Sequence, residues 1–137
     1  MRIKNRLLLF SISLFFCFAL TGTLFTPEIP REIVDCFNKG NSRELSQHFN
    51  NNIELVVLDN EDVYSKSQAE LILRNFFSVN KPVGFKLLHQ GGPELSRYAI
   101  GNLETKKGNF RIYFLLKGND DALLIHLLRI ERVEDDY

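Results

Sequence analysis

The sequence lacks the features that would assign a function directly. Its 17 Lys and Arg residues balance 17 Asp and Glu residues, and a net charge of zero gives no basic field for nucleic acid. It contains no Gly-rich phosphate loop and no HExxH, CxxC or GxSxG motif. We therefore expect no nucleic-acid partner, no cofactor and no metal, and no motif names an enzyme class.

The chain nevertheless contains many hydrophobic residues that can form a core. Hydrophobic residues make up 45% of its 137 residues, aromatic residues make up 12%, and twelve residues are Phe. This composition is typical of a globular protein rather than of a disordered chain, and the length suits one domain.

The first 25 residues form a separate segment, MRIKNRLLLFSISLFFCFALTGTLF. Arg2, Lys4 and Arg6 precede residues 7–20, which are all apolar or Ser. A basic start followed by an apolar stretch is the pattern of a signal peptide, so we expect export to the periplasm or cell envelope. The alternative is an uncleaved anchor in the inner membrane, because residues 7–25 carry no charge. Membrane contact is expected only in that case.

Cleavage would change the charge and the cysteine count. It leaves 14 Lys and Arg against 17 Asp and Glu, a net charge of −3. It also leaves one cysteine, Cys36, which cannot form an internal disulfide. Cys36 shares a predicted helix face with Ile33 and Phe37, so we expect it to be buried as a small hydrophobic residue.

Two short helices are predicted at the start of the domain, which we place at residues 28–134. The first covers residues 31–39, opened by Pro30 and closed by Gly40. The second is predicted within NSRELSQHF (41–49), where Asn41 and Glu44 fit a capping box. Its shared face would be formed by Leu45, His48 and Phe49.

A hairpin and a longer helix follow. Residues 53–65, IELVVLDNEDVYS, combine β-branched residues with the turn sequence DNED. Ser65 and Gln68 then fit a second capping box. The helix after them carries an apolar stripe along one side. This helix is predicted to end before Pro82, because proline disfavours helix at the residue that precedes it. The stripe consists of Ala69, Ile72, Leu73, Phe76 and Phe77.

Everything after Pro82 is predicted to be strand. The segments VGFKLLHQ, RYAIGNLET, NFRIYFLLK and ALLIHLLRIERVE are separated by the turn sequences GGPELS, KKG and GNDD. Three consecutive hairpins give an antiparallel meander, and helices beside such a sheet predict an α+β fold.

Several pieces carry a resemblance to a known family. They are KGNSRELSQHF, VYSKSQAELILRNFF, FKLLHQGG, YAIGNLETKKGNFRIYFLLK and LRIE. The chain resembles the bacterial family called domain of unknown function 4783, and its order of elements resembles the nuclear transport factor 2-like fold. The resemblance implies a cone, in which a curved antiparallel sheet packs on N-terminal helices and one longer helix. It implies no activity and no catalytic residues.

Candidate site residues depend on the strand registers. A turn at Lys107–Gly108 would place Asn102 opposite Tyr113 and Glu104 opposite Arg111. A four-residue GNDD loop would place Tyr113 opposite His126. Asn102, Tyr113 and His126 then form a row under the helix, as a pocket or as a structural polar network. Such a row would suit an acid–base enzyme of isomerase or dehydratase type. In that enzyme His126 would act as the base, and Tyr113 and Asn102 would polarise a carbonyl of the substrate.

A second choice of pocket is formed by His89, Tyr98 and Arg111, with His89 opposite Tyr98.

The pattern makes both faces of the sheet largely apolar, and the helices can cover only one of them. We therefore expect the other face to bind a second copy of the chain. The favoured function is a non-enzymatic binding or interaction module acting as a dimer, with a small hydrophobic ligand or a protein as a further candidate partner. The alternatives are the acid–base enzyme and a membrane-tethered envelope protein.

Overall fold

The structure, a computed structural model, describes residues 22, 28–119 and 122–134. The predicted export segment lies outside the described residues, apart from Gly22. None of the helices in the described part is long and apolar enough to cross a membrane.

The described residues form an α+β fold with three helices and one six-stranded sheet. The helices are α2 (Arg31–Lys39), α3 (Ser42–Gln47) and α4 (Lys66–Val79). The strands are β1 (Phe49–Val57), β2 (Asn60–Ser65), β3 (Pro82–Gly91), β4 (Ser96–Thr105), β5 (Gly108–Asn119) and β6 (Ala122–Arg132).

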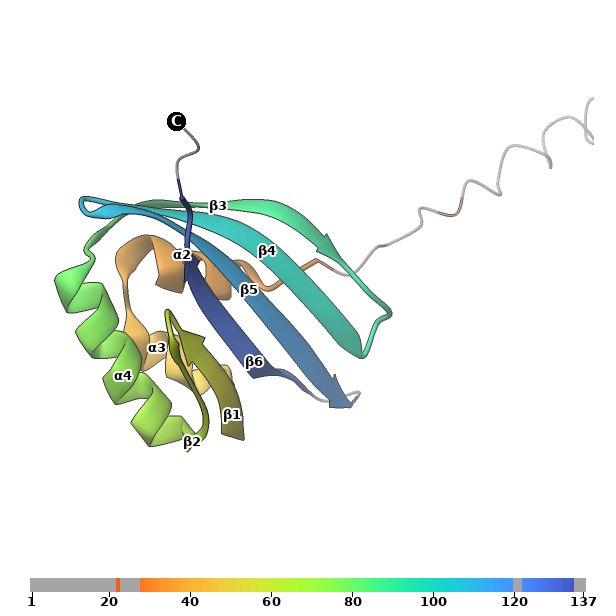
Figure 1. Cartoon of the computed structure of the whole chain (residues 1–137). Coiled ribbons are helices and arrows are strands. Elements are labelled where there is room, and N and C mark those ends of the chain that lie inside the picture. Colours follow the sequence, from red (N-terminus) through yellow and green to blue (C-terminus); the bar gives the residue numbers. More distant parts are fainter. Residues whose placement is uncertain (1–21, 23–27, 120–121, 135–137) are drawn as a thin grey trace, which may run out of the picture.

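The strand order across the sheet is β2-β1-β6-β5-β4-β3. The predicted meander from β3 to β6 is antiparallel throughout, whereas β1 joins β6 in parallel. Figure 1 shows the sheet curving over α2 and α3, with α4 alongside the β1–β2 hairpin. The side of the sheet that packs on the helices is called the inner face below, and the opposite side the outer face.

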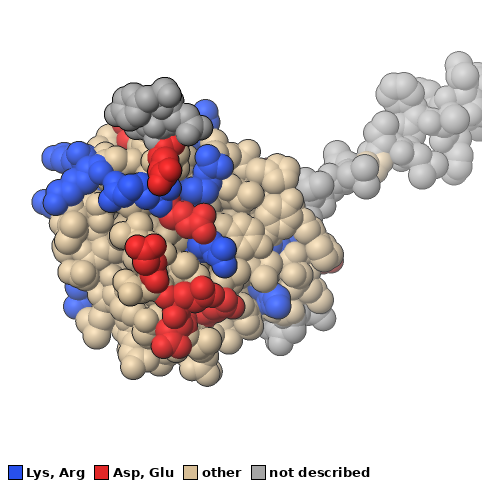
Figure 2. Space-filling model, in the orientation of Figure 1, with Lys and Arg blue, Asp and Glu red and all other residues tan. Residues whose placement is uncertain are grey.

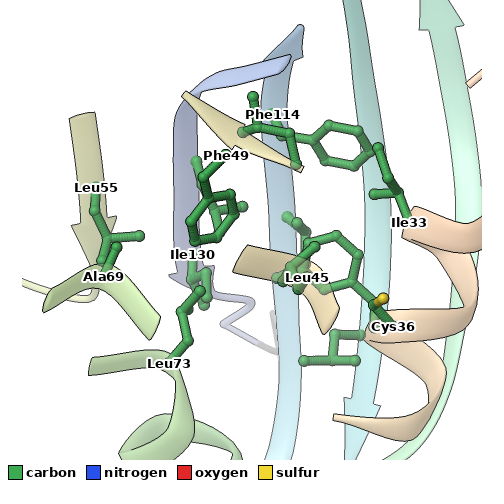
Figure 3. Close-up of a cluster of buried hydrophobic side chains, with 14 of the residues drawn as sticks. Ile33, Cys36, Leu45, Phe49, Leu55, Ala69, Leu73, Phe114 and Ile130 are labelled. Carbon is green, nitrogen blue, oxygen red and sulfur yellow. The ribbon is translucent and has the colours of Figure 1, made fainter. Parts of the chain in front are cut away.

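Aromatic rings join the helices to the inner face. Phe37 of α2 stacks on Phe85 of β3, with ring centroids 4.9 Å apart, and on Phe114 of β5 at 5.7 Å. Phe76 of α4 meets Phe110 of β5 edge to face at 5.0 Å. Figure 3 shows the centre of this core, where side chains from the helices and the sheet interdigitate. The core thus uses the Phe-rich composition to fill the space under the sheet.

The predicted ends of the first and third helices agree with the structure. Gly40, in the left-handed conformation with φ 62°, ends α2, and its N–H donates to the Phe37 carbonyl. Ser65 and Gln68 form the full capping box of α4. The helix stops at Val79, before Pro82.

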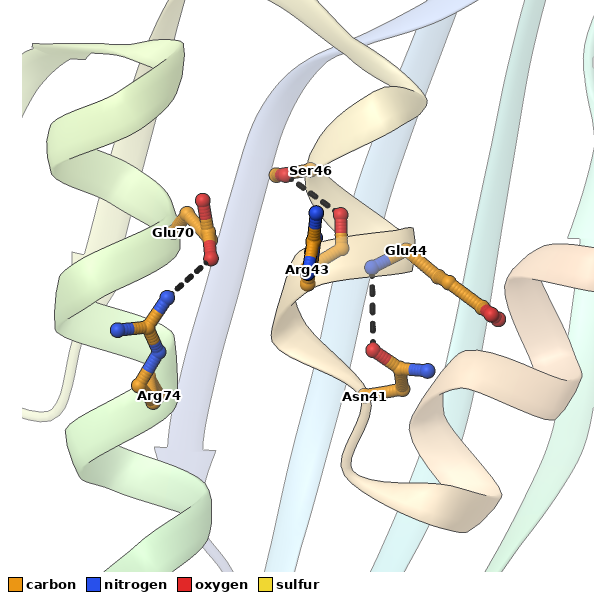
Figure 4. A network of polar contacts seen from close by, with 6 residues as sticks. All are labelled: Asn41, Arg43, Glu44, Ser46, Glu70 and Arg74. Carbon is orange, nitrogen blue, oxygen red and sulfur yellow. Dashed lines mark hydrogen bonds and ion pairs between the residues drawn. The ribbon is translucent and has the colours of Figure 1, made fainter.

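The second predicted helix is shorter than expected. It ends at Gln47, and Phe49 begins β1 instead of continuing the helical face. The reason is pairing with β6, because the His48 carbonyl accepts a hydrogen bond from the Ile125 N–H at 2.7 Å. At its start, Asn41 accepts from the Glu44 N–H at 3.1 Å, while Figure 4 shows the Glu44 carboxylate directed away. Half of the predicted capping box therefore forms.

The hairpin turn also lies earlier than predicted. Val57 pairs with Asn60, so Leu58 and Asp59 make the turn. The other residues of the predicted turn sequence, Asn60, Glu61 and Asp62, belong to β2. Leu58 has a positive φ of 56°, which is rare for a leucine.

Candidate functional site on the outer sheet face

All three residues of the predicted row lie in strands β4 to β6. In β4, Ala99, Gly101 and Leu103 are buried, whereas Ile100 and Asn102 between them are half-buried. Successive side chains of a strand point to opposite faces. Since Leu103 belongs to the helix-packed core, Asn102 projects on the outer face. The same alternation in β5 places Tyr113 there, between buried Ile112 and Phe114.

The turn between β4 and β5 differs from the predicted one by one residue. Thr105 pairs with Gly108, so Lys106 and Lys107 form the turn. Asn102 therefore lies opposite Arg111 and not opposite Tyr113. Glu104 pairs with Asn109 instead of Arg111. Because each partner moves by two residues, the residues predicted to share a face still share it. The predicted position of the row under the helix is wrong, because Asn102 and Tyr113 lie on the outer face.

A bulge in β6 breaks the rest of the row. Leu116 pairs with Ile125 and Leu115 pairs with Leu127, which leaves His126 as the extra, half-buried residue between them. The β5–β6 ladder also runs on to the pair Asn119 and Ala122, whereas the predicted four-residue GNDD loop would pair Lys117 with Ala122. The longer ladder moves each partner by two residues and the bulge by one more, so Tyr113 faces Arg129 and not His126. The structure thus separates His126 from the other two residues of the predicted row. Arg129 was missed because the predicted loop between β5 and β6 was too long and because a bulge leaves no clear signal in a run of leucines.

A second bulge, in β3, changes the other candidate set. Leu87 pairs with Gly101 and His89 pairs with Ile100, so Leu88 is the extra residue. The predicted pairing of His89 with Tyr98 is wrong in register, yet the two side chains meet diagonally. His89 Nε2 lies 2.9 Å from the Tyr98 hydroxyl, a hydrogen-bonding distance. Arg111, the third member, is not part of this contact and lies opposite Asn102.

The structure brings together residues from both predicted sets. The rings of Tyr98 and Tyr113 stack with centroids 6.4 Å apart, so His89, Tyr98 and Tyr113 form a line across β3, β4 and β5. This line lies on the side of the sheet away from the helices. Its hydrogen-bonding groups therefore face the surface of the chain rather than a cavity under α4.

Apolar side chains surround these tyrosines on the outer face. We call this surface the outer patch, and its members are all half-buried although none of the described helices covers them. It comprises Tyr98, Ile100, Tyr113, Leu115, Leu124 and Leu127. The space-filling view is mostly uncharged over β4 and β5, and acidic side chains gather over the β1–β2 hairpin (Figure 2).

Arg129 sits at the edge of the outer patch, between Val56 of β1 and Tyr113 of β5 in the sheet. Its Nη1 lies 3.6 Å from the Glu131 carboxylate. Its Nε is buried and has no hydrogen-bond partner among the described residues.

Metal chemistry has no visible support in this part of the chain. Within residues 28–119 and 122–134, no group of three or more His, Cys, Asp or Glu side chains could hold an ion. His89 and His126 lie on strands separated by β4 and β5.

Comparison with known proteins gives the family. A crystallised family member from Bacteroides ovatus is 34% identical, with a TM-score of 0.75 over 80% of this chain and 100% of that one. One from Bacteroides fragilis is 36% identical, with a TM-score of 0.73 over 77% and 100%. An NTF2 protein described as having a long sheet is 17% identical and similar in fold, with a TM-score of 0.59 over 73% and 94%. No curated protein matches the chain. The family described as domain of unknown function (DUF4783) matches residues 30–131, and the chain belongs to this family.

Proposed function

We propose that the domain is a non-enzymatic interaction module that pairs with a second copy through its outer patch. The observation that carries the proposal is the uncovered apolar surface of Tyr98, Ile100, Tyr113, Leu115, Leu124 and Leu127. Contiguous apolar surface of this kind marks interaction sites in soluble proteins. Tyrosine suits such a surface, because its ring is apolar and its hydroxyl can bond across an interface.

The size of the outer face supports pairing with a folded partner. Four neighbouring strands of about ten residues present roughly 600 Å² of flat surface at the usual strand spacings. A standard interface buries about 800 Å² on each partner. A second copy related by a two-fold axis would match the outer patch with itself, as two-fold interfaces do.

The proposal also includes the fold family and the cellular location of the domain. We take the sheet and helices to form the nuclear transport factor 2-like cone, supported by the similarity to the NTF2 protein above. We also propose that the domain works after export, which the basic and apolar segment 1–25 supports. Mass spectrometry of the protein recovered from cells tests this part. A chain lacking this segment would support cleavage, and an intact start would favour the membrane anchor.

The dimer is tested by light scattering on the purified protein at tens of micromolar. We expect twice the chain mass for the parent and a single chain mass for Leu115→Asp, because the charge would be buried in the interface. Leu71→Asp is the matched control, since Leu71 is 57% exposed on α4. Circular dichroism establishes that both variants fold. A monomeric parent, or a dimer that survives Leu115→Asp, would refute the proposed interface.

A further inference from the structure

A cavity separate from the outer patch lies between α4 and the β1–β2 hairpin. Its volume is about 260 Å³, and its lining comes from β1, the turn after it, β2, α4 and the residue that follows α4. The apolar lining residues are Leu55, Val57, Leu58, Ile72, Phe76 and Val79, joined by the ring of Tyr64. Leu55 and Val57 belong to the helix-packed core, so this cavity opens beside the inner face.

The cavity has a buried end and an exposed mouth. Leu55, Phe76 and Asn80 are buried, whereas Leu58 is 39% and Val79 is 49% exposed. Two large aliphatic side chains exposed at one mouth offer apolar surface to a molecule that enters it. A volume of about 260 Å³ is slightly below the roughly 300–1,000 Å³ typical of small-molecule pockets, which restricts the ligand to a compact one.

The polar groups of the lining are neutral. They are the side-chain amides of Asn60, Asn75 and Asn80 and the phenol of Tyr64, and no described Lys, Arg, Asp or Glu lines the cavity. Asn80 is held in place, because its Nδ2 donates to the Phe76 carbonyl at 3.2 Å and its backbone N–H donates to the same carbonyl at 2.8 Å. That arrangement leaves the amide oxygen of Asn80 as an acceptor. An ionised ligand would lose its hydration here without gaining a counter-charge.

The turn between β1 and β2 forms part of this mouth. Leu58, with φ 56°, is the one residue other than glycine with positive φ in the described part of the chain. Its backbone is fixed by a hydrogen bond from its N–H to the Ile130 carbonyl at 2.9 Å. Glycine or asparagine would adopt this conformation at lower cost. The two-residue turn between β1 and β2 needs a positive φ at its first position, and it places a leucine at the entrance.

From these observations we infer that the cavity binds a compact, neutral, mainly apolar molecule carrying one hydrogen-bonding group, such as a medium-chain alcohol. The chain would lie against Leu55, Ile72 and Phe76, and the polar group would bond to an asparagine amide. This site is independent of the proposed dimer, because its walls do not include any residue of the outer patch.

The test is an amide NMR titration of the ¹⁵N-labelled protein with 1-octanol, and in parallel with octanoate at neutral pH. We expect saturable shifts at Leu58, Ile72, Asn75 and Asn80 with octanol, and at least tenfold weaker binding of octanoate. Equal binding of the two probes, shifts outside the cavity, or no saturable shifts would overturn the inference.

Two variants locate the site, and a third serves as their control. Ile72→Trp should fill the cavity and abolish the shifts, whereas Leu71→Trp, on the exposed side of the same helix, should bind octanol like the parent. If Ile72→Trp fails to fold, Leu58→Gly replaces it, because glycine relieves the positive φ and removes the apolar mouth. Leu58→Gly should raise the melting temperature and weaken octanol binding several-fold. Unchanged binding in a folded Ile72→Trp or Leu58→Gly variant would rule out this cavity.

Discussion

The ring of Phe85 on β3 occupies the space where a side chain at Gly101 on β4 would lie. A Cβ atom added to Gly101 would overlap the ring atoms Cζ and Cε2 and would come 3.1 Å from the Lys86 carbonyl oxygen. The ring has little freedom to move aside, because it stacks on Phe37 of α2 at 4.9 Å. Gly101 therefore allows β3 and β4 to bring a phenyl ring onto the inner face under α2.

We predict that Gly101→Val destabilises the domain by about 1–3 kcal/mol, the usual cost of overpacking a core. Adding Phe85→Leu should recover part of this loss, because the smaller side chain makes room for the valine. Urea unfolding of the two variants measures both effects. Gly84→Val is the control, since a Cβ at Gly84 meets no atom within 4 Å. Equal losses at Gly84 and Gly101 would contradict the steric explanation.

Phe76 is expected to be among the most sensitive positions of α4. It is 5% exposed and contacts the rings of Phe77 and Phe110, at 5.6 and 5.0 Å between centroids. Phe76→Ala should lower the free energy of unfolding by about 3–5 kcal/mol. Leu71→Ala, on the exposed side of the same helix, should change it by about 0.5 kcal/mol or less. Thermal melts that place both variants within a degree or two of the parent would disprove the assigned helix face.

The capping box at the start of α4 gives a third prediction. The Gln68 N–H donates to Ser65 Oγ at 3.3 Å, and the Ser65 N–H donates to Gln68 Oε1 at 3.1 Å. Ser65→Ala should cost about 1 kcal/mol, because it leaves the first of these N–H groups without its partner. Ser65→Asp keeps an acceptor in place and should retain most of the stability. A denaturant titration measures both variants. Equal destabilisation of the two would show that the side-chain acceptor at position 65 does not stabilise the helix.

Cys36 is expected to be an unreactive thiol. Burial raises the pKa of the Cys36 thiol above its ordinary value, and the negative charges of Glu44 and Asp35 raise it further. The thiolate is the reactive form, so alkylation of Cys36 in the native protein at pH 8 should be slow. Peptide mass mapping after timed alkylation measures the rate, with the urea-unfolded protein as the reference. Labelling as fast as in urea would mean that Cys36 is accessible.

The raised pKa of the Cys36 thiol also predicts that the stability of the domain depends on pH. A folded pKa above the unfolded value of about 8.5 means that the folded state holds the proton more tightly. The resulting stabilisation is fully present below the unfolded pKa and is lost as pH rises through the folded pKa. Unfolding free energies measured from pH 7 to 10 should therefore fall more steeply for the parent than for Cys36→Ala. Parallel curves would show that this thiol makes no contribution.

The residues themselves determined where most helices and strands begin and end. Gly40, the pair Ser65 and Gln68, and Pro82 each act on backbone groups within a few residues, so their effects follow from the local sequence. The repeat of Phe76 and Phe77 with Leu73 likewise marked the buried side of α4, because helical spacing is local. Turn sequences separated the last four strands for the same reason.

Tertiary structure alone decided which strand residues meet. Phe49 leaves the predicted helix because β6 offers it hydrogen bonds, and β6 follows it by more than seventy residues in the chain. The bulges at Leu88 and His126 each insert one residue, and a one-residue shift reverses the face of every side chain beyond it. The bulge at His126, together with the extension of the β5–β6 ladder to Asn119 and Ala122, separated His126 from Tyr113 and brought Arg129 opposite Tyr113. Such choices depend on packing between distant segments, where many registers have similar local energies and only the assembled sheet selects one.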